Sequence, residues 1–344
     1  MTATIPPLHR DYASLKCQPS PVPTQSQHGG MEECELPLID LSGMKSRIPQ
    51  VRQECAMSIA KASMEWGFFQ VVNHGISLRL LRDMRREQVK LFDTSFEQKA
   101  SCGILNNSYR WGNPTATSAT QFSWSEAFHV PLEKMSDDSC FGDFISLRNV
   151  MEEFALAMSK LAKQLVGILA ERVGQAETAF DDICDESTCF LRLNHYPACP
   201  ISAEVFGLVP HTDSDFLTIL SQDQVGGLQL RKDSRWVAVK PNKDALIVNI
   251  GDLLQAWSND VYKSVEHKVM ANAEMDRYSV AYFLCPSYES MIRSCREPSI
   301  YKSFTFGEYR KQIQEDVKNR GHKVGLPRFL APVLSAAAGE TSTC

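Results

Sequence analysis

Residues 209–217, with the sequence VPHTDSDFL, decide how the middle of this chain folds and what it can bind. Side chains in an extended strand alternate between its two faces, so His211 and Asp213 project to the same side. A second imidazole, His267, follows much later and can join them if a sheet folds back on itself. Two imidazoles and one carboxylate can occupy one face of a metal ion and leave the opposite face open. That arrangement suits non-haem Fe(II) chemistry with O2.

A second group of polar residues, Arg277 and Ser279, follows shortly after His267. Residues 278–283, YSVAYF, have the β-branched and aromatic content of a strand, and its period of two places Arg277 and Ser279 on one face. A guanidinium beside a hydroxyl is a good clamp for a carboxylate, because Arg donates two parallel hydrogen bonds in a fixed fork. A metal site with such a clamp one strand away suits a 2-oxo-dicarboxylate.

Further motifs surround these residues in a fixed order. They are residues 36–41 (LPLIDL), 66–75 (WGFFQVVNHG), 194–197 (NHYP), 225–229 (VGGLQ) and 249–252 (NIGD). Together with the two groups above, they resemble the plant 2-oxoglutarate- and Fe(II)-dependent dioxygenases over residues 36–331. The resemblance implies Fe(II), held by His211, Asp213 and His267, and ascorbate as the reductant. It also implies 2-oxoglutarate as co-substrate, held by Arg277, Ser279, Tyr196 and Asn194.

A narrower resemblance lies in residues 109–112 (YRWG) and 124–130 (WSEAFHV). These are similar to the gibberellin 2-oxidases, in the subgroup that acts on C20 gibberellins. The resemblance implies hydroxylation at C2 with O2 and 2-oxoglutarate, which gives succinate and CO2 and inactivates the hormone or its precursors. One alternative is a dioxygenase acting on a flavonoid or on another gibberellin position. A zinc hydrolase using the same triad and a non-enzymatic jelly-roll binding protein are further alternatives. The carboxylate clamp argues against the hydrolase, and the intact triad argues against the binding protein.

Aromatic residues on and after the 101–125 segment are candidates for the apolar wall of a terpenoid pocket, with core packing as the alternative. The segment is rich in Asn, Ser, Thr and Gly, and we expect a long loop over the site. Arg110 is a candidate partner for a substrate carboxylate, because gibberellins are acids; a solvated loop cation is the alternative. His129 shares an expected strand with Phe128 and is a further candidate. The expected substrate contacts are Tyr109, Arg110, Trp124, Phe128, Phe216 and Phe283.

Composition limits the possible partners. The hydrophobic content of 43% and charged content of 22% are ordinary for a globular protein, and the net charge of −5 argues against a nucleic-acid surface. We find no signal-peptide pattern and no apolar run long enough to cross a membrane, so we expect a cytoplasmic protein. The 11 scattered cysteines predict reduced thiols. None of these features indicates an oligomeric state.

The order of expected elements predicts a mixed α and β fold, with a double-stranded β-helix (jelly roll) core flanked by N-terminal and C-terminal helices. Apolar periodicity predicts helices over residues 78–92 and 148–173, and Thr305 with Glu308 forms a capping box before a C-terminal helix. We expect one dioxygenase domain over residues 36–334. It comprises a mainly helical part (36–180), the jelly-roll catalytic core (185–300) and the C-terminal helix (301–334). Residues 1–35 and 335–344 are expected to be flexible tails.

Overall fold

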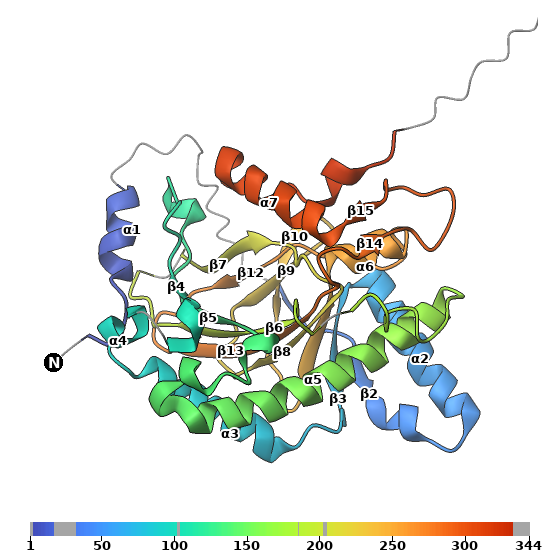
Figure 1. Cartoon of the computed structure of the whole chain (residues 1–344), viewed down its shortest axis with the longest axis horizontal. Coiled ribbons are helices and arrows are strands. Elements are labelled where there is room, and N and C mark those ends of the chain that lie inside the picture. The colour runs from blue at the N-terminus through green and yellow to red at the C-terminus, as the bar shows by residue number, and fades with distance from the viewer. Residues whose placement is uncertain (1–2, 17–31, 102–103, 185, 202–204, 333–344) are drawn as a thin grey trace, which may run out of the picture.

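Two β-sheets lie face to face at the centre of the computed structural model, and helices cover the outer face of the larger sheet (Figure 1). The structure describes residues 3–16, 32–101, 104–184, 186–201 and 205–332. Most neighbouring strands in both sheets are antiparallel. This is the mixed α and β fold with a double-sheet jelly-roll core that the sequence predicted.

The larger sheet has eight strands, and only its edge pair β2 and β3 is parallel. In spatial order its strands are β2 (Leu38–Asp40), β3 (Phe68–Val72), β11 (Leu246–Ile250), β8 (Leu217–Gln222), β13 (Arg277–Leu284), β6 (Phe190–Tyr196), β5 (Glu126–Pro131) and β4 (Tyr109–Trp111). The smaller sheet has the order β1 (Glu33–Cys34), β10 (Arg235–Val239), β9 (Leu228–Lys232), β12 (His267–Met270) and β7 (Phe206–His211). A separate pair joins β14 (Met291–Ile292) to β15 (Phe304–Thr305).

Seven α-helices surround the sheets in the described part of the chain. They are α1 (Leu8–Lys16), α2 (Pro49–Glu65), α3 (Leu78–Phe92), α4 (Phe96–Ala100), α5 (Ile145–Arg172), α6 (Asp252–Trp257) and α7 (Phe306–Arg320). The predicted capping box of Thr305 and Glu308 is confirmed at the start of α7. Gly321 ends this helix in the left-handed region, with φ of 76°, where a residue without Cβ is favoured. Among the described helices, none is both long enough and apolar enough to cross a bilayer.

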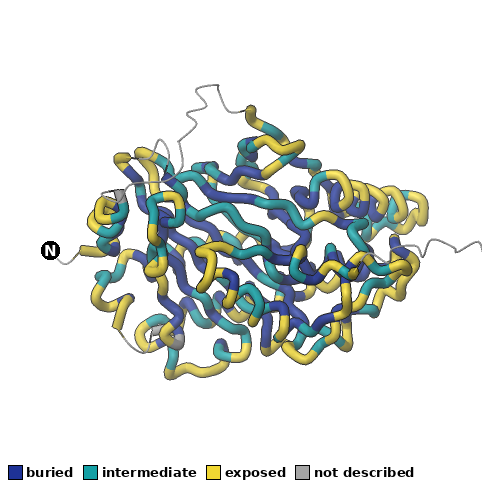
Figure 2. The backbone as a smooth tube through the Cα atoms, turned by 90° about the horizontal axis from the view of Figure 1, so that it is seen from above, coloured by how far each residue is buried: buried dark blue, intermediate teal, exposed yellow. Residues whose placement is uncertain are grey.

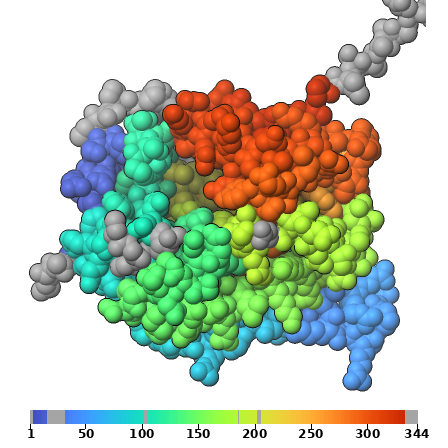
Figure 3. Space-filling model, viewed as in Figure 1, coloured from blue at the N-terminus to red at the C-terminus, as the bar shows by residue number. Residues whose placement is uncertain are grey.

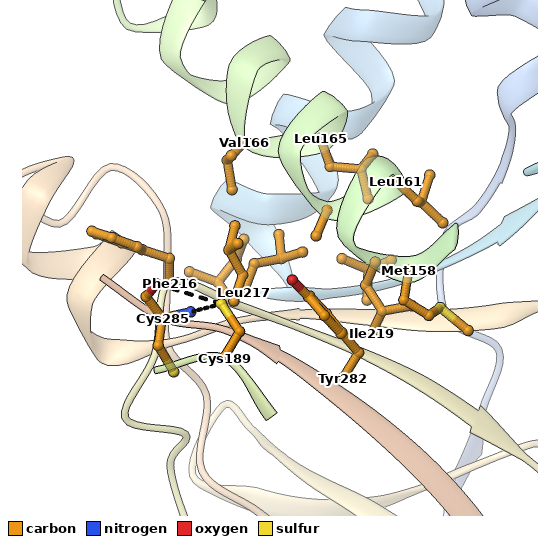
Figure 4. Close-up of a cluster of buried hydrophobic side chains, with 14 of the residues drawn as sticks. Met158, Leu161, Leu165, Val166, Cys189, Phe216, Leu217, Ile219, Tyr282 and Cys285 are labelled. Carbon is orange, nitrogen blue, oxygen red and sulfur yellow. Dashed lines mark hydrogen bonds between the residues drawn. The ribbon is translucent and has the colours of Figure 1, made fainter. Parts of the chain in front are cut away.

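The main core lies between α5 and the outer face of the larger sheet. Met158, Leu161 and Leu165 point from α5 toward Leu217 and Ile219 on β8 (Figure 4). All five side chains are almost completely buried, and each contributes roughly 1.5–3 kcal/mol through loss of apolar surface to water. Figure 2 shows the same layering, with buried strands inside and exposed backbone on the outer turns of the helices. The opposite face of the larger sheet is therefore left to form a pocket.

The N-terminal segment differs from the flexible tail predicted for residues 1–35. Residues 8–16 form α1, and Leu8 and Tyr12 are buried against Phe122 and Trp124. Two apolar residues four positions apart were enough to hold this helix on the protein, although the surrounding composition is polar. The expected flexibility around residues 21–30 and at 335–344 concerns positions outside the described residues.

Candidate active site

His211, Asp213 and His267 come together where the smaller sheet faces the larger one. His211 ends β7 and His267 begins β12, and the two residues are direct partners in the antiparallel pairing of these strands. The Nε2 atoms of His211 and His267 lie 3.6 and 3.8 Å from Oδ1 of Asp213. One ligand atom from each residue lies within 4.8 Å of the other two. Two imidazoles and a carboxylate at this spacing fit a single Fe(II) ion.

Hydrogen bonds fix the orientation of each of these side chains. Nδ1 of His211 lies 2.8 Å from the carbonyl of Val209, and Nδ1 of His267 lies 3.0 Å from the carbonyl of Val265. Because a carbonyl only accepts, each Nδ1 carries the proton and each Nε2 keeps its lone pair toward the site. Burial, followed by the neighbouring His267, lowers the pKa of His211 to about 3. The imidazole of His211 is therefore neutral near pH 7 and able to bind a metal.

Asp213 is held as a carboxylate by two neighbours on the larger sheet. Its Oδ2 accepts hydrogen bonds from Thr218 at 2.6 Å and from Asn249 at 2.7 Å. Burial alone would raise the pKa of Asp213, but the adjacent imidazoles and these two hydrogen bonds outweigh it and lower the pKa. Asp215 has the same strand parity, yet it lies outside the triad, with its Oδ2 2.8 Å from the hydroxyl oxygen of Thr218.

The C-terminal segment clamps the loop that carries Asp213. Nζ of Lys323 donates to the carbonyl of Thr212 at 2.9 Å and to the hydroxyl of Ser214 at 2.7 Å. The same ammonium forms a buried ion pair with Asp252, at 2.5 Å, and Tyr309 of α7 donates to that carboxylate. Asp252, the last residue of the 249–252 motif, opens α6 and connects this helix to the metal-binding loop.

The predicted carboxylate clamp lies on the inner face of the larger sheet. Arg277 is only 2% exposed, and its Nη2 donates to Gln222 at 2.7 Å. Its Nε and Nη1 are buried without a hydrogen-bond partner among the described residues. A buried guanidinium with two unpaired donors is costly unless a ligand accepts from it, and a carboxylate fits that fork. The guanidinium also lies 4.9 Å from the centre of the Tyr196 ring.

Strand register explains why these residues share one surface. Arg277 is directly opposite Tyr196, and Ser279 is directly opposite Asn194, in the pairing of β13 with β6. The amide of Asn194 lies 3.4 Å from the hydroxyl of Ser279. All four side chains line the same cavity as His211, Asp213 and His267. The structure therefore brings the predicted metal ligands and the predicted co-substrate contacts to one site.

The cavity has a volume of about 310 Å³ and opens beside α7. Figure 3 shows a hollow between α7, in red, and the teal part of the chain. Phe68, His129, Phe190 and Phe283 supply aromatic walls to the cavity. Of the six expected substrate contacts, only Phe283 lies in this lining.

The other expected aromatic contacts lie in the core. Phe128 is completely buried and packs on Phe92 and Tyr109, because it points to the opposite face of β5 from His129. Tyr109 donates to the buried carboxylate of Glu126. Trp124 packs against α1, and Phe216 packs against Phe180 under the sheet. The apolar surface of these aromatic side chains is therefore buried in the core and does not face the pocket.

The 101–125 segment is also more ordered than the loop predicted for it. Residues 109–111 form the edge strand β4, which pairs with β5. Arg110 is exposed and donates to the carbonyls of Asn107 and Tyr109. It lines a smaller cavity of about 300 Å³ that shares His129 and Arg192 with the main one. Arg110 is therefore near the main pocket without lining it.

A buried charge network lies behind the co-substrate surface. His195 alternates with Asn194 and Tyr196 along β6, and its ring nitrogens contact Glu126 at 2.7 Å and Asp276 at 3.0 Å. Burial lowers the pKa of His195, but the hydrogen bonds with Asp276 and Glu126 outweigh burial, so the pKa is raised overall. Lys99 completes the network through an ion pair with Glu126 at 2.8 Å.

Several residues that line the cavity wall were not predicted from the sequence. Phe190 and Arg192 on β6, and Phe306 and Arg310 on α7, line it. Strand parity would have found the first two, since they continue the alternation of Asn194 and Tyr196. The two on α7 are one helical turn apart, but no short motif connects this helix to the site.

Comparisons with known proteins agree with this geometry. A profile of the 2OG-Fe(II) oxygenase superfamily matches residues 187–286. A second profile, described as the N-terminal region of the non-haem dioxygenases in morphine synthesis, matches residues 36–151. This chain belongs to the 2OG-Fe(II) oxygenase superfamily. It is therefore an Fe(II)- and 2-oxoglutarate-dependent dioxygenase, as predicted.

Individual relatives of this oxygenase match along most of its length. Gibberellin 2-beta-dioxygenase 6 of Oryza sativa subsp. japonica is 57% identical, over 94% of this chain and 95% of the relative. Gibberellin 2-beta-dioxygenase 8 of Arabidopsis thaliana is 55% identical, over 87% of this chain and 88% of the relative. The crystal structure of JOX2 in complex with 2OG, Fe and JA is similar with a TM-score of 0.75. It has 28% identity and covers 96% of this chain and all of that chain.

Proposed function

We propose that this oxygenase is a gibberellin 2-oxidase that hydroxylates C2 of C20 gibberellins. The observation that carries the proposal is the 57% identity to a gibberellin 2-beta-dioxygenase along almost the whole of both chains. The site supports it, because a metal triad, a carboxylate clamp and an aromatic wall share one cavity. The net reaction consumes one O2 and one 2-oxoglutarate, and yields the hydroxylated gibberellin, succinate and CO2. It inactivates the hormone or its precursors.

Each group of residues has a defined task in this proposal. His211, Asp213 and His267 hold Fe(II), which together with O2 and 2-oxoglutarate supplies the oxidising power. Arg277 and Ser279 bind the distal carboxylate of 2-oxoglutarate.

Neighbouring residues assist them. Tyr196 and Asn194 line the same cavity as this clamp and the metal triad, and hold the co-substrate in one orientation. Phe68, Leu208 and Leu228 supply apolar walls that exclude water around the reacting carbon. We also propose ascorbate as the reductant that maintains Fe(II), and the cytoplasm as the location.

Product analysis tests the proposal. The purified protein is incubated with Fe(II), ascorbate, 2-oxoglutarate and a panel of C20 and C19 gibberellins, and the products are identified by mass spectrometry and by comparison with 2-hydroxylated standards. We expect 2-hydroxylated C20 gibberellins formed with one succinate per turnover. Oxidation at another carbon, or selective turnover of a flavonoid included in the panel, would replace the proposal with the alternative dioxygenase activity.

A further inference from the structure

Two positively charged side chains line the cavity in addition to Arg277 of the co-substrate clamp. They are Arg192 on β6 and Arg310 on α7, and His129 of β5 lines the cavity with them. In the sheet register, Arg192 is directly opposite His129 on one side and Ala281 on the other. Ala281 also lines the cavity, and its small side chain fills little of it.

These arginines have no acidic partner. Neither Arg192, Arg310 nor the nearby Arg110 forms a salt bridge with a carboxylate anywhere in the described ranges. Arg192 uses Nε to donate to the neutral amide oxygen of Asn194 at 2.8 Å, and Arg310 donates to the hydroxyl of Tyr288 at 3.3 Å. The positive charge of these arginines in the cavity is therefore left without a carboxylate partner among the described residues.

The effect of this charge is visible on His129. Burial, followed by the positive charges of Arg192, Arg310 and Arg110, lowers the pKa of His129 to about 4. The imidazole is therefore neutral near pH 7, and the local charge belongs to the arginines. Guanidinium groups that are half-buried and close to one another repel, and a bound anion relieves that repulsion.

A flat apolar surface lies next to the arginines. The rings of His129 and Phe190 stack with centroids 3.9 Å apart, and those of Phe190 and Phe283 stack at 4.3 Å. All three line the cavity. Such a row of rings suits one face of a rigid, fused hydrocarbon skeleton.

We propose that Arg192 and Arg310 bind a carboxylate of the substrate while its ring skeleton lies on the His129, Phe190 and Phe283 rings. This inference rests on the proposed function and deepens it, because it makes an apolar polycyclic carboxylic acid the substrate class. The acid group then determines which carbon of the skeleton faces the metal triad. Arg192 and Arg310 are specificity-determining residues in this assignment.

Arg192 and the co-substrate clamp occupy different positions along the sheet. Arg192 is opposite Ala281, which is four residues from Arg277 on β13. At ~3.3 Å per residue, the backbones at these two positions lie roughly 13 Å apart along the strand. The Arg192 side chain crosses part of that distance, because its Nε donates to Asn194. Its remaining guanidinium donors, and those of Arg310, have no carboxylate partner among the described residues and are available to another acid.

The experiment measures ligand binding without turnover. The protein is loaded with Mn(II) and 2-oxoglutarate under anaerobic conditions, and the affinity of three probes is measured by titration calorimetry. The probes are a C20 gibberellin free acid, its methyl ester, and a tricyclic resin acid that is not a gibberellin. Variants are Arg192→Met and Arg310→Met, which keep apolar bulk and remove the charge. Arg293→Met removes the same charge from an exposed position outside the cavity, and serves as the matched control.

We expect each cavity variant to bind the free acid about 10- to 100-fold more weakly, the loss of one charge-assisted hydrogen bond or more. The ester should bind the unchanged protein weakly and should be affected little by either variant. The control should bind all probes as the unchanged protein does. Affinity for 2-oxoglutarate should stay the same in Arg310→Met and in the Arg293→Met control, which shows that the site remains folded. Arg192→Met also loses the bond to Asn194, so Arg310→Met is the variant that separates acid binding from co-substrate binding.

The outcomes separate this inference from the proposed function. If the gibberellin acid and its ester bind equally and both cavity variants bind normally, the carboxylate assignment is overturned while gibberellin remains the substrate. If the gibberellin fails to bind but the resin acid binds in an Arg192- and Arg310-dependent way, the acid site stands and the gibberellin assignment falls. If Arg110→Met has the larger effect on the free acid, the site belongs to the smaller cavity and the assignment to Arg192 and Arg310 is wrong.

Discussion

Replacing Arg277 with lysine tests the co-substrate clamp most directly. In the structure, Nη2 of Arg277 is used by Gln222, while Nε and Nη1 are buried without partners in the described chain. Two donors in a fixed fork are therefore available to a carboxylate. Lysine keeps the charge but presents a compact ammonium on a flexible stem, so at least one of the two bonds is lost.

The size of the effect follows from that single bond. A charge-assisted hydrogen bond contributes about 1.5–3 kcal/mol, so Arg277→Lys should weaken 2-oxoglutarate binding about 10- to 150-fold. The assay is a titration of 2-oxoglutarate into anaerobic, Mn(II)-loaded protein, followed by the apparent Michaelis constant with Fe(II). Metal affinity itself should stay unchanged, because the triad does not contact Arg277 in the structure.

A matched substitution controls for the loss of an arginine fork as such. Arg328 holds Asp316 through Nε and Nη2, at 3.1 and 2.7 Å, far along the chain from the clamp. Arg328→Lys should lower stability slightly and leave 2-oxoglutarate affinity unchanged. The reasoning is refuted if Arg277→Lys binds 2-oxoglutarate as tightly as the unchanged protein, or if both lysine variants lose affinity equally.

Three other predictions concern the metal, its loop and the buried histidine. Asp213→Asn should abolish Mn(II) binding measured by calorimetry, whereas Asp215→Asn should retain it, because only the first carboxylate lies between the two imidazoles; equal affinities would exclude the assigned triad. Lys323→Met should lower the free energy of unfolding in urea by about 3–5 kcal/mol, because it removes the cation from a buried pair, and should weaken Mn(II) binding; unchanged values for both would show that the clamp is unimportant. The pKa of His195 is raised above the ordinary 6.5 in the folded protein. The stabilisation that its protonated form contributes is therefore complete below pH 6.5 and is lost as pH rises through the higher pKa of the folded state. His195→Gln should remove this pH dependence of the urea midpoint, and an unaltered pH profile would contradict the prediction.

The sequence was sufficient to predict which residues gather at the candidate metal and co-substrate site, because their signals are local. His211 and Asp213 are two residues apart on an extended segment, and Arg277 and Ser279 are two residues apart on a strand. Period two and side-chain chemistry then suffice to place each pair on one face. The long-range step, bringing His267 beside His211, required a folded-back sheet and is visible in the β7–β12 pairing.

The substrate residues were harder to predict because hydrophobicity alone does not distinguish a pocket from a core. Trp124 and Phe128 have the composition of a pocket wall, yet one packs on α1 and the other under the sheet. The helix α1 was itself missed, since its two anchors have no local capping motif. Arg310 comes from a helix distant in sequence, and only the packing of α7 over the open end of the sheets places it in the cavity.

Strand β6 carries cavity-lining residues on one face and core residues on the other. Phe190, Arg192, Asn194 and Tyr196 face the cavity, while the alternate residues, ending with His195, are buried on the other face. A shift of β6 by one residue would exchange these two sets completely. It would place a charged guanidinium in the apolar core and turn Asn194 and Tyr196 away from the cavity. Because the same alternation serves the core on one face and the cavity on the other, selection for a stable sheet also keeps Arg192, Asn194 and Tyr196 in the cavity lining.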